Sequence, residues 1–161
     1  MLPSPLLSLA ADVLDRAKAR GVMIATAESC TGGLIAGCLT EIAGSSAVVE
    51  RGFVTYSNEA KTEMLGVPAP VIASVGAVSE EVARAMAEGA LKRSRAQLTV
   101  AVTGVAGPGG GSPEKPVGLV HFGCAMRDAE TLHRRVVFDG DRSDVRRETV
   151  RTALEMLRER L

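Results

Sequence analysis

The segment TAESCTGG, Thr26 to Gly33, places an acid, hydroxyls, a thiol and two glycines between two apolar runs. A strand that enters a helix through such a turn directs the free N–H groups and positive end of the helix into the turn, where they can hold an anion or oxyanion. Ser29 is a candidate nucleophile at a sharp turn, although the GxSxG pattern of a nucleophile elbow is absent. The alternative is that Ser29 or Thr31 caps the helix.

A second polar cluster, YSNEAK from Tyr56 to Lys61, follows an expected strand. Lys61 would lie in the first turns of a short helix and could reach the same end of the sheet as Ser29. His121 and His133 fall within expected strands, so no histidine is available for a Ser-His-Asp arrangement. A lysine can act as base if its pKa falls from about 10.4 to about 7, a difference of about 4 kcal/mol. The alternative is a solvated surface lysine.

The third cluster is the glycine- and proline-rich segment TGVAGPGGGSPEKPVG, Thr103 to Gly118. Its backbone N–H groups are free to face a ligand, but the lysine of a Walker motif is missing and the spacing is not a dinucleotide fingerprint. The segment is therefore either a ligand-binding loop or a flexible connection. Its place after a strand puts it beside the other two clusters.

The composition restricts the class of protein. A chain of 161 residues with 46% hydrophobic content predicts one domain spanning residues 1–161. The formal net charge of zero argues against a nucleic acid or an anionic membrane as partner. The apolar runs are shorter than the roughly 20 residues of a membrane span, and the N-terminus lacks the basic region of a signal peptide. The chain has three widely spaced cysteines, Cys30, Cys38 and Cys124. Their number and spacing favour neither a disulfide framework nor a zinc site, so a reducing compartment, the cytoplasm, is expected.

Helical and strand periodicities alternate along the chain. Apolar residues recur at helical spacing from Leu6 to Ala17, up to a stop at Gly21, and Val22–Thr26 predicts a buried strand followed by a helix. The other expected elements are a strand at Arg51–Ser57, helices at 59–66 and Glu80–Lys92, strands at 97–104, 117–126 and 131–138, and a terminal helix to Leu161. This order predicts an α/β fold: a single three-layer α/β/α domain with a mixed β-sheet of about five strands.

Polar residues at the expected helix starts suggest which side chains cap them. Asn58 is expected to cap the short helix, and Ser79 the helix that ends at Lys92. Either Asp141 or Ser143 is expected to cap the terminal helix.

Five segments together resemble the CinA C-terminal family, whose stand-alone members are nicotinamide mononucleotide amidohydrolases of the PncC type. They are TAESCTGG, GFVTYSNEAKTEMLGV, GAVSEEVARAMAEGA, TVAVTGVAGPGGGSPEKPVGLVHFG and GDRSDVRRETV. The resemblance implies hydrolysis of the carboxamide of nicotinamide mononucleotide, in pyridine nucleotide salvage, without a metal or other cofactor. It also implies that Ser29 is the nucleophile and Lys61 its base, with Tyr56 and Thr103 placed beside them.

Several substrate contacts are further expectations. Backbone N–H groups of the first motif would stabilise an oxyanion: those of Cys30, Thr31, Gly32 and Gly33. Glu28 would meet ribose hydroxyls or the pyridinium charge. The glycine loop would take the phosphate through Gly104, Gly107, Gly109 and Gly110.

Alternatives remain at this point. Cys30 is the rival nucleophile beside Ser29. The same loops could form a nucleotide-binding or regulatory module that performs no chemistry. The hypothesis of a phosphatase is weakened by the lack of clustered acidic metal ligands. The expected partner is a small nucleotide, and the expected assembly is a homo-oligomer, most simply a dimer.

Overall fold

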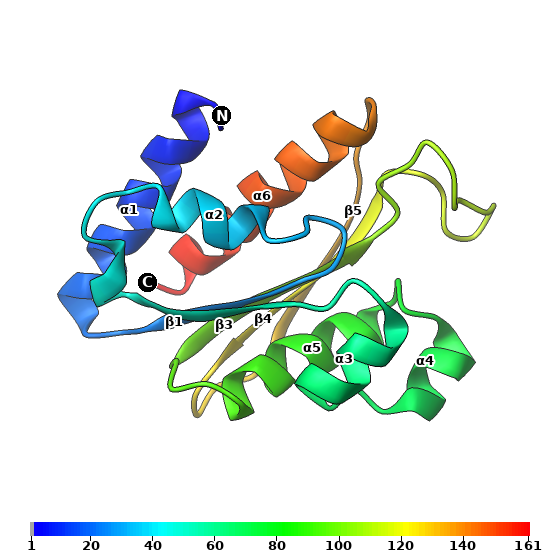
Figure 1. Ribbon diagram of the computed structural model, residues 1–161, viewed down its shortest axis with the longest axis horizontal. Helices are drawn as coiled ribbons and strands as arrows, with labels where there is room; N and C mark the ends of the chain where they lie inside the picture. Colours follow the sequence, from blue (N-terminus) through cyan, green and yellow to red (C-terminus); the bar gives the residue numbers. More distant parts are fainter. Residues whose placement is uncertain (1) are drawn as a thin grey trace.

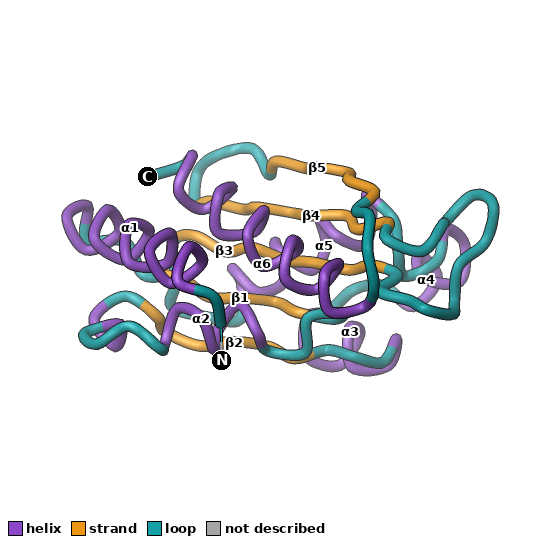
Figure 2. The backbone as a smooth tube through the Cα atoms, turned by 90° about the horizontal axis from the view of Figure 1, so that it is seen from above, coloured by secondary structure: helices purple, strands orange, loops and turns teal. Residues whose placement is uncertain are grey.

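Five strands form one mixed sheet in the computed structural model, which describes residues 2–161 (Figure 2). The strand order is β2-β1-β3-β4-β5. The central strand β3 is parallel to β1, β1 is parallel to β2, and β4 and β5 continue the sheet as an antiparallel meander. The strands are β1 (Ile24–Glu28), β2 (Val49–Val54), β3 (Leu98–Gly104), β4 (Leu119–Met126) and β5 (Leu132–Val137).

Helices cover both faces of the sheet, so the expected three-layer α/β/α architecture is confirmed (Figure 1). One layer holds α1 (Ser4–Arg20), α2 (Leu34–Thr40) and α6 (Arg142–Glu159). The other holds α3 (Asn58–Leu65), α4 (Ala69–Val75) and α5 (Glu80–Lys92), and a 3-10 turn at Ser45–Ala47 precedes β2. None of the helices within residues 2–161 has both the length and the apolar character needed to cross a bilayer.

The two faces of the sheet differ in side-chain size. On β3, Val100 and Val102 belong to the core beneath α1, α2 and α6. On the other face the strands present small residues to α5, including Ala101 and Gly123. A Cβ atom on Gly123 would collide with the Ala83 carbonyl of α5, so glycine permits the close approach of this helix to the sheet.

The first strand lies two residues later than expected. The sequence predicted Val22–Thr26, but Gly21 adopts a left-handed conformation (φ 66°) and the Val22 N–H bonds back to Ala17, as part of the helix stop. The strand continues to Glu28 because its last residues pair with both β2 and β3. Ser29 therefore stands directly at the carboxyl end of a central strand.

Helix caps follow the sequence with one exception. Ser79 caps α5, as expected, and Asp141 rather than Ser143 caps α6. The assignment of Asn58 to the short helix was wrong, because the Ser57 hydroxyl accepts the Ala60 N–H and Asn58 is the first helical residue. Helix α4 was not expected; Pro68 precedes it, Pro70 is its second residue, and Gly76 follows it.

Candidate active site

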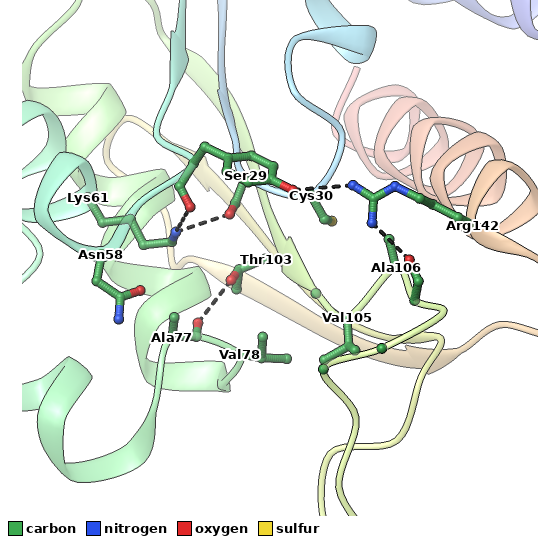
Figure 3. Close-up of a pocket in the computed structure, with 15 residues that line it drawn as sticks. Ser29, Cys30, Asn58, Lys61, Ala77, Val78, Thr103, Val105, Ala106 and Arg142 are labelled. Atoms are coloured by element: carbon green, nitrogen blue, oxygen red, sulfur yellow. Dashed lines mark hydrogen bonds between the residues drawn. The ribbon is translucent and has the colours of Figure 1, made fainter.

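An open cavity of about 320 Å³ lies beyond the carboxyl ends of β1 and β3 (Figure 3). Parallel strands that end together leave such a crevice at one edge of the sheet. All three polar clusters of the sequence contribute to its lining. The residues that line it are Ser29, Cys30, Tyr56, Asn58, Lys61, Ala77, Val78, Thr103, Gly104, Val105, Ala106, Gly107, Gly109, Gly110 and Arg142.

Ser29 and Lys61 are in direct contact within this cavity. The Lys61 Nζ atom lies 3.0 Å from the Ser29 Oγ atom, although the residues are 32 positions apart. The Ser57 cap starts α3 so that Lys61, in its first turn, extends back under the end of β2. The carbonyl oxygens of Thr55 (2.9 Å), Tyr56 (3.4 Å) and Ser57 (3.4 Å) also accept hydrogen bonds from Nζ.

Burial prepares the Lys61 amine to act as a base. The residue is only 1% exposed, and this burial lowers the pKa of Lys61 below its ordinary value because the charged form is desolvated. Among residues 2–161 the amine contacts hydroxyl and carbonyl oxygens and no carboxylate. A neutral amine here can take the proton of the Ser29 hydroxyl, as a serine nucleophile requires.

Glu28, rather than Ser29 or Thr31, satisfies the start of α2. One carboxylate oxygen accepts the Ile35 N–H (2.8 Å) and the Thr31 hydroxyl, and the other accepts the Ala36 N–H (3.0 Å). The capping alternative for Ser29 is therefore wrong, and its hydroxyl is left to Lys61. A carboxylate at the positive end of a helix is also favoured by the helix dipole.

This capping corrects the expected role of Glu28. The side chain is fully buried, both its oxygens are bound within the protein, and it does not line the cavity. Glu28 therefore binds the first amides of α2 in place of the expected contact with the substrate. The helix N-terminus is likewise occupied by this carboxylate, so it does not face the cavity as a free anion site.

Of the four residues that follow Ser29, only Cys30 lines the cavity. Thr31, Gly32 and Gly33 were expected at the substrate but do not line the cavity, and the Gly32 N–H bonds to the Ser29 carbonyl (3.0 Å). Cys30 does line it, and its N–H donates to no other residue within 2–161. The Cys30 N–H is therefore the candidate oxyanion donor of this turn.

Tyr56, Thr103 and the glycine loop are brought together as expected. Thr103 is 1% exposed and its hydroxyl donates to the Ala77 carbonyl (2.9 Å), which leaves its oxygen able to accept from a ligand. The Tyr56 side chain is exposed at the mouth of the cavity. The expected loop residues all line the cavity: Gly104, Gly107, Gly109 and Gly110.

Two polar side chains of the cavity were not assigned to the site from the sequence, Asn58 and Arg142. Arg142, the first residue of α6, donates to the Gly107 carbonyl (2.8 Å) and to the Tyr56 hydroxyl (3.2 Å) (Figure 3). It lies in the GDRSDVRRETV segment, one of the five that carry the family resemblance, but no local pattern distinguishes it from the other arginines among the fifteen in the sequence. Asn58 was interpreted only as a helix cap.

Cys30 is a poor nucleophile in this environment. Burial raises the pKa of the Cys30 thiol to about 12, so the thiolate is scarce at neutral pH. We expect Cys30→Ser to keep kcat/KM for the amide substrate within about threefold of the wild type, or about 0.7 kcal/mol, measured as initial rates of ammonia release. A loss above about a hundredfold (about 2.7 kcal/mol) in both Cys30→Ser and Cys30→Ala would instead identify Cys30 as the nucleophile.

Known proteins resemble the chain over nearly its whole length. The CinA C-terminal domain model matches residues 6–161. Nicotinamide-nucleotide amidohydrolase PncC of Escherichia coli (strain K12) is 54% identical over 157 residues, which cover 98% of this chain and 95% of that protein. A CinA-like protein of Mycolicibacterium gilvum (strain PYR-GCK) is 57% identical over 141 residues, but these are only 33% of its length.

A solved structure agrees with these matches. The competence/damage inducible protein CihA from Agrobacterium tumefaciens has a TM-score of 0.95 and 57% sequence identity, and the match covers 98% of this chain and 96% of that one. Sequence, fold and the arrangement of the motifs around one cavity thus agree, and the chain belongs to the CinA C-terminal family.

Proposed function

We propose that this protein hydrolyses the carboxamide of nicotinamide mononucleotide to nicotinic acid mononucleotide and ammonia, a step of pyridine nucleotide salvage. The observation that carries the proposal is the 3.0 Å contact between Ser29 Oγ and the buried Lys61 Nζ in an open cavity. The full-length similarity to a protein named nicotinamide-nucleotide amidohydrolase supports this choice among amide substrates.

Acylation begins when Ser29 Oγ attacks the carboxamide carbon and its proton passes to the neutral Lys61 amine. The Cys30 N–H stabilises the oxyanion, a contribution of about 3 kcal/mol for such a donor in other hydrolases. Lys61 then protonates the amide nitrogen, the C–N bond breaks and ammonia leaves. The product of this half-reaction is an ester between Ser29 and the nicotinoyl group.

Deacylation repeats the proton transfers with water. Lys61, neutral again after giving its proton to the departing amide nitrogen, takes a proton from the attacking water, and the ester bond to Ser29 breaks as that proton passes to Oγ. The acid is released and both side chains regain their starting state. One amine thus serves both half-reactions.

The rest of the cavity suits a nucleotide. The Arg142 guanidinium and the backbone from Gly107 to Gly110 lie side by side, and together they offer charge and N–H groups to a phosphate. The Thr103 hydroxyl oxygen can accept from the carboxamide NH₂ group, because its own proton is donated to Ala77. These contacts would hold both ends of a pyridine mononucleotide.

The setting of the enzyme is part of the proposal. We propose the cytoplasm as its compartment, supported by the three cysteines, which are all unpaired. A small nucleotide is its proposed partner, without nucleic acid or membrane, and a homodimer its proposed assembly.

Ammonia release from nicotinamide mononucleotide tests the proposal. The protein is incubated with the nucleotide, and ammonia and nicotinic acid mononucleotide are quantified in parallel, with and without exhaustive treatment with a chelator. We expect equal amounts of both products and no effect of the chelator, because the proposed base is an amine. Tight binding without ammonia would indicate a nucleotide-binding module instead. Activity lost to the chelator and restored by a divalent ion would indicate a metal-dependent mechanism.

A further inference from the structure

Arg146 of α6 contacts the back of the nucleophile turn, Ser29–Gly33. Its Nε donates to the Cys30 carbonyl (3.1 Å) and a terminal nitrogen donates to the Thr31 carbonyl (3.2 Å). We propose that Arg146 is a positioning residue that fixes the peptide groups behind Ser29 for attack and oxyanion binding. The inference rests on the proposed function only in the identity of the substrate.

The Cys30 carbonyl depends on Arg146. Within residues 2–161 it accepts a hydrogen bond from no other group, whereas the Thr31 carbonyl also accepts the Leu34 N–H (3.1 Å). Gly32 follows them in a left-handed conformation (φ 60°), and a Cβ atom there would be 3.6 Å from the guanidinium. The guanidinium therefore lies against the turn at Gly32 as well as at the two carbonyl groups.

Holding these carbonyls sets the orientation of the turn. A peptide unit is planar, and its C=O and N–H point in opposite directions, so fixing the Cys30 carbonyl also fixes the plane between Cys30 and Thr31. The strand side of the turn is anchored separately, because the Ser29 N–H donates to the Val102 carbonyl (3.2 Å). Ser29 and the Cys30 N–H therefore lie between one anchor in the sheet and one on α6.

Arg146 differs from neighbouring arginines of α6 in the kind of group that its guanidinium contacts. Arg151 pairs with Glu148 at the surface, and Arg147 pairs with Asp144. The guanidinium contacts of Arg146 within residues 2–161 are instead to backbone oxygens of the turn.

Helix α6 also links two parts of the cavity. Residues four apart share one side of a helix, and Arg142 lies four residues before Arg146. Arg142 holds the Gly107 carbonyl of the glycine loop, while Arg146 holds the nucleophile turn. The start of α6 therefore fixes the distance between the reacting serine and the loop proposed to bind the phosphate.

The test compares Arg146→Met, Arg146→Lys and the control Arg151→Met, which removes a surface arginine of the same helix. With nicotinamide mononucleotide, we expect Arg146→Met to lower kcat about 10- to 100-fold while KM changes less than about threefold, because the lost contact acts on transition-state geometry. Arg146→Lys should recover part of kcat, and Arg151→Met should match the wild type. Melting temperatures establish that all variants are folded.

A second readout does not depend on the substrate. A fluorophosphonate probe forms a bond from Ser29 Oγ to phosphorus as fluoride leaves, and intact mass follows its rate. We expect slower labelling in Arg146→Met and partial recovery in Arg146→Lys, even if the wild type proves inactive on nicotinamide mononucleotide. Labelling of folded Arg146→Met at the wild-type rate would overturn the positioning role. If Arg146→Met does not fold, the same comparison is made with Arg146→Lys, whose labelling at the wild-type rate would likewise overturn it.

Discussion

Ser29→Ala is expected to lower kcat/KM for nicotinamide mononucleotide by at least about 10⁴-fold, or about 5.5 kcal/mol of transition-state stabilisation. The covalent route disappears with the hydroxyl, and only binding and oxyanion contacts remain to assist direct attack by water. Ammonia release measures the loss, and calorimetric titration with the nucleotide should give a Kd within about threefold of the wild type, equal to about 0.7 kcal/mol.

The appropriate control for Ser29→Ala is Cys30→Ala, which shortens the neighbouring side chain in the same turn. This variant should remain active, because the thiol is buried and protonated. Residual activity of Ser29→Ala above about one tenth of wild type (a loss below about 1.4 kcal/mol) would exclude Ser29 as nucleophile.

Lys61→Met is expected to cause a loss of similar size. Methionine keeps much of the length of the buried side chain but has no amine to accept the Ser29 proton. Because the two residues act as one unit, the Ser29→Ala/Lys61→Met double variant should be no slower than the worse single variant. Rates of ammonia release for the three variants test this directly.

A lysine control is available on the surface. Lys92, exposed at the end of α5, should be replaceable by methionine without loss of rate. Near wild-type turnover by folded Lys61→Met would refute the proposed base, and additive losses in the double variant would show that Ser29 and Lys61 act independently.

Lys61 also determines the pH dependence of the wild type. Only the neutral amine accepts a proton, so kcat/KM should be low below the pKa of Lys61 and rise as pH increases through it. Burial lowers this pKa, so the rise should be centred below the ordinary lysine value of about 10.4. The neighbouring Cys30 side chain acts in the opposite direction and raises the pKa of Lys61, but burial is the larger effect. A profile that falls with increasing pH would contradict a lysine base.

Local patterns in the sequence were sufficient for the class of fold. Strand and helix periodicities alternate, and they report which side chains are buried, so the three layers could be predicted without coordinates. Short elements were harder to predict: α4 was missed because a segment of seven residues that contains a proline gives little periodic signal.

The motifs located Ser29 and Lys61, but not the contact between them. Ser29 directly follows β1, Lys61 lies in the helix that follows β2, and the parallel pairing of β1 with β2 places the ends of these two strands together. The structure also corrected the role of Glu28, from a contact with the substrate to an acceptor for the first amides of α2. Helix α2 begins at Leu34, later than the motif suggests, so its first amides lie within reach of the Glu28 carboxylate.

The sequence alone determined most of the elements, the family motifs and the residue types that could perform amide hydrolysis, because these depend on neighbours a few positions apart. Only the tertiary structure decided which side chains meet. Arg142 and Arg146 lie more than a hundred residues after Ser29, and they reach its surroundings because α6 packs on the same face of the sheet as α2. Such contacts depend on the packing of distant elements, and a local pattern does not encode that packing.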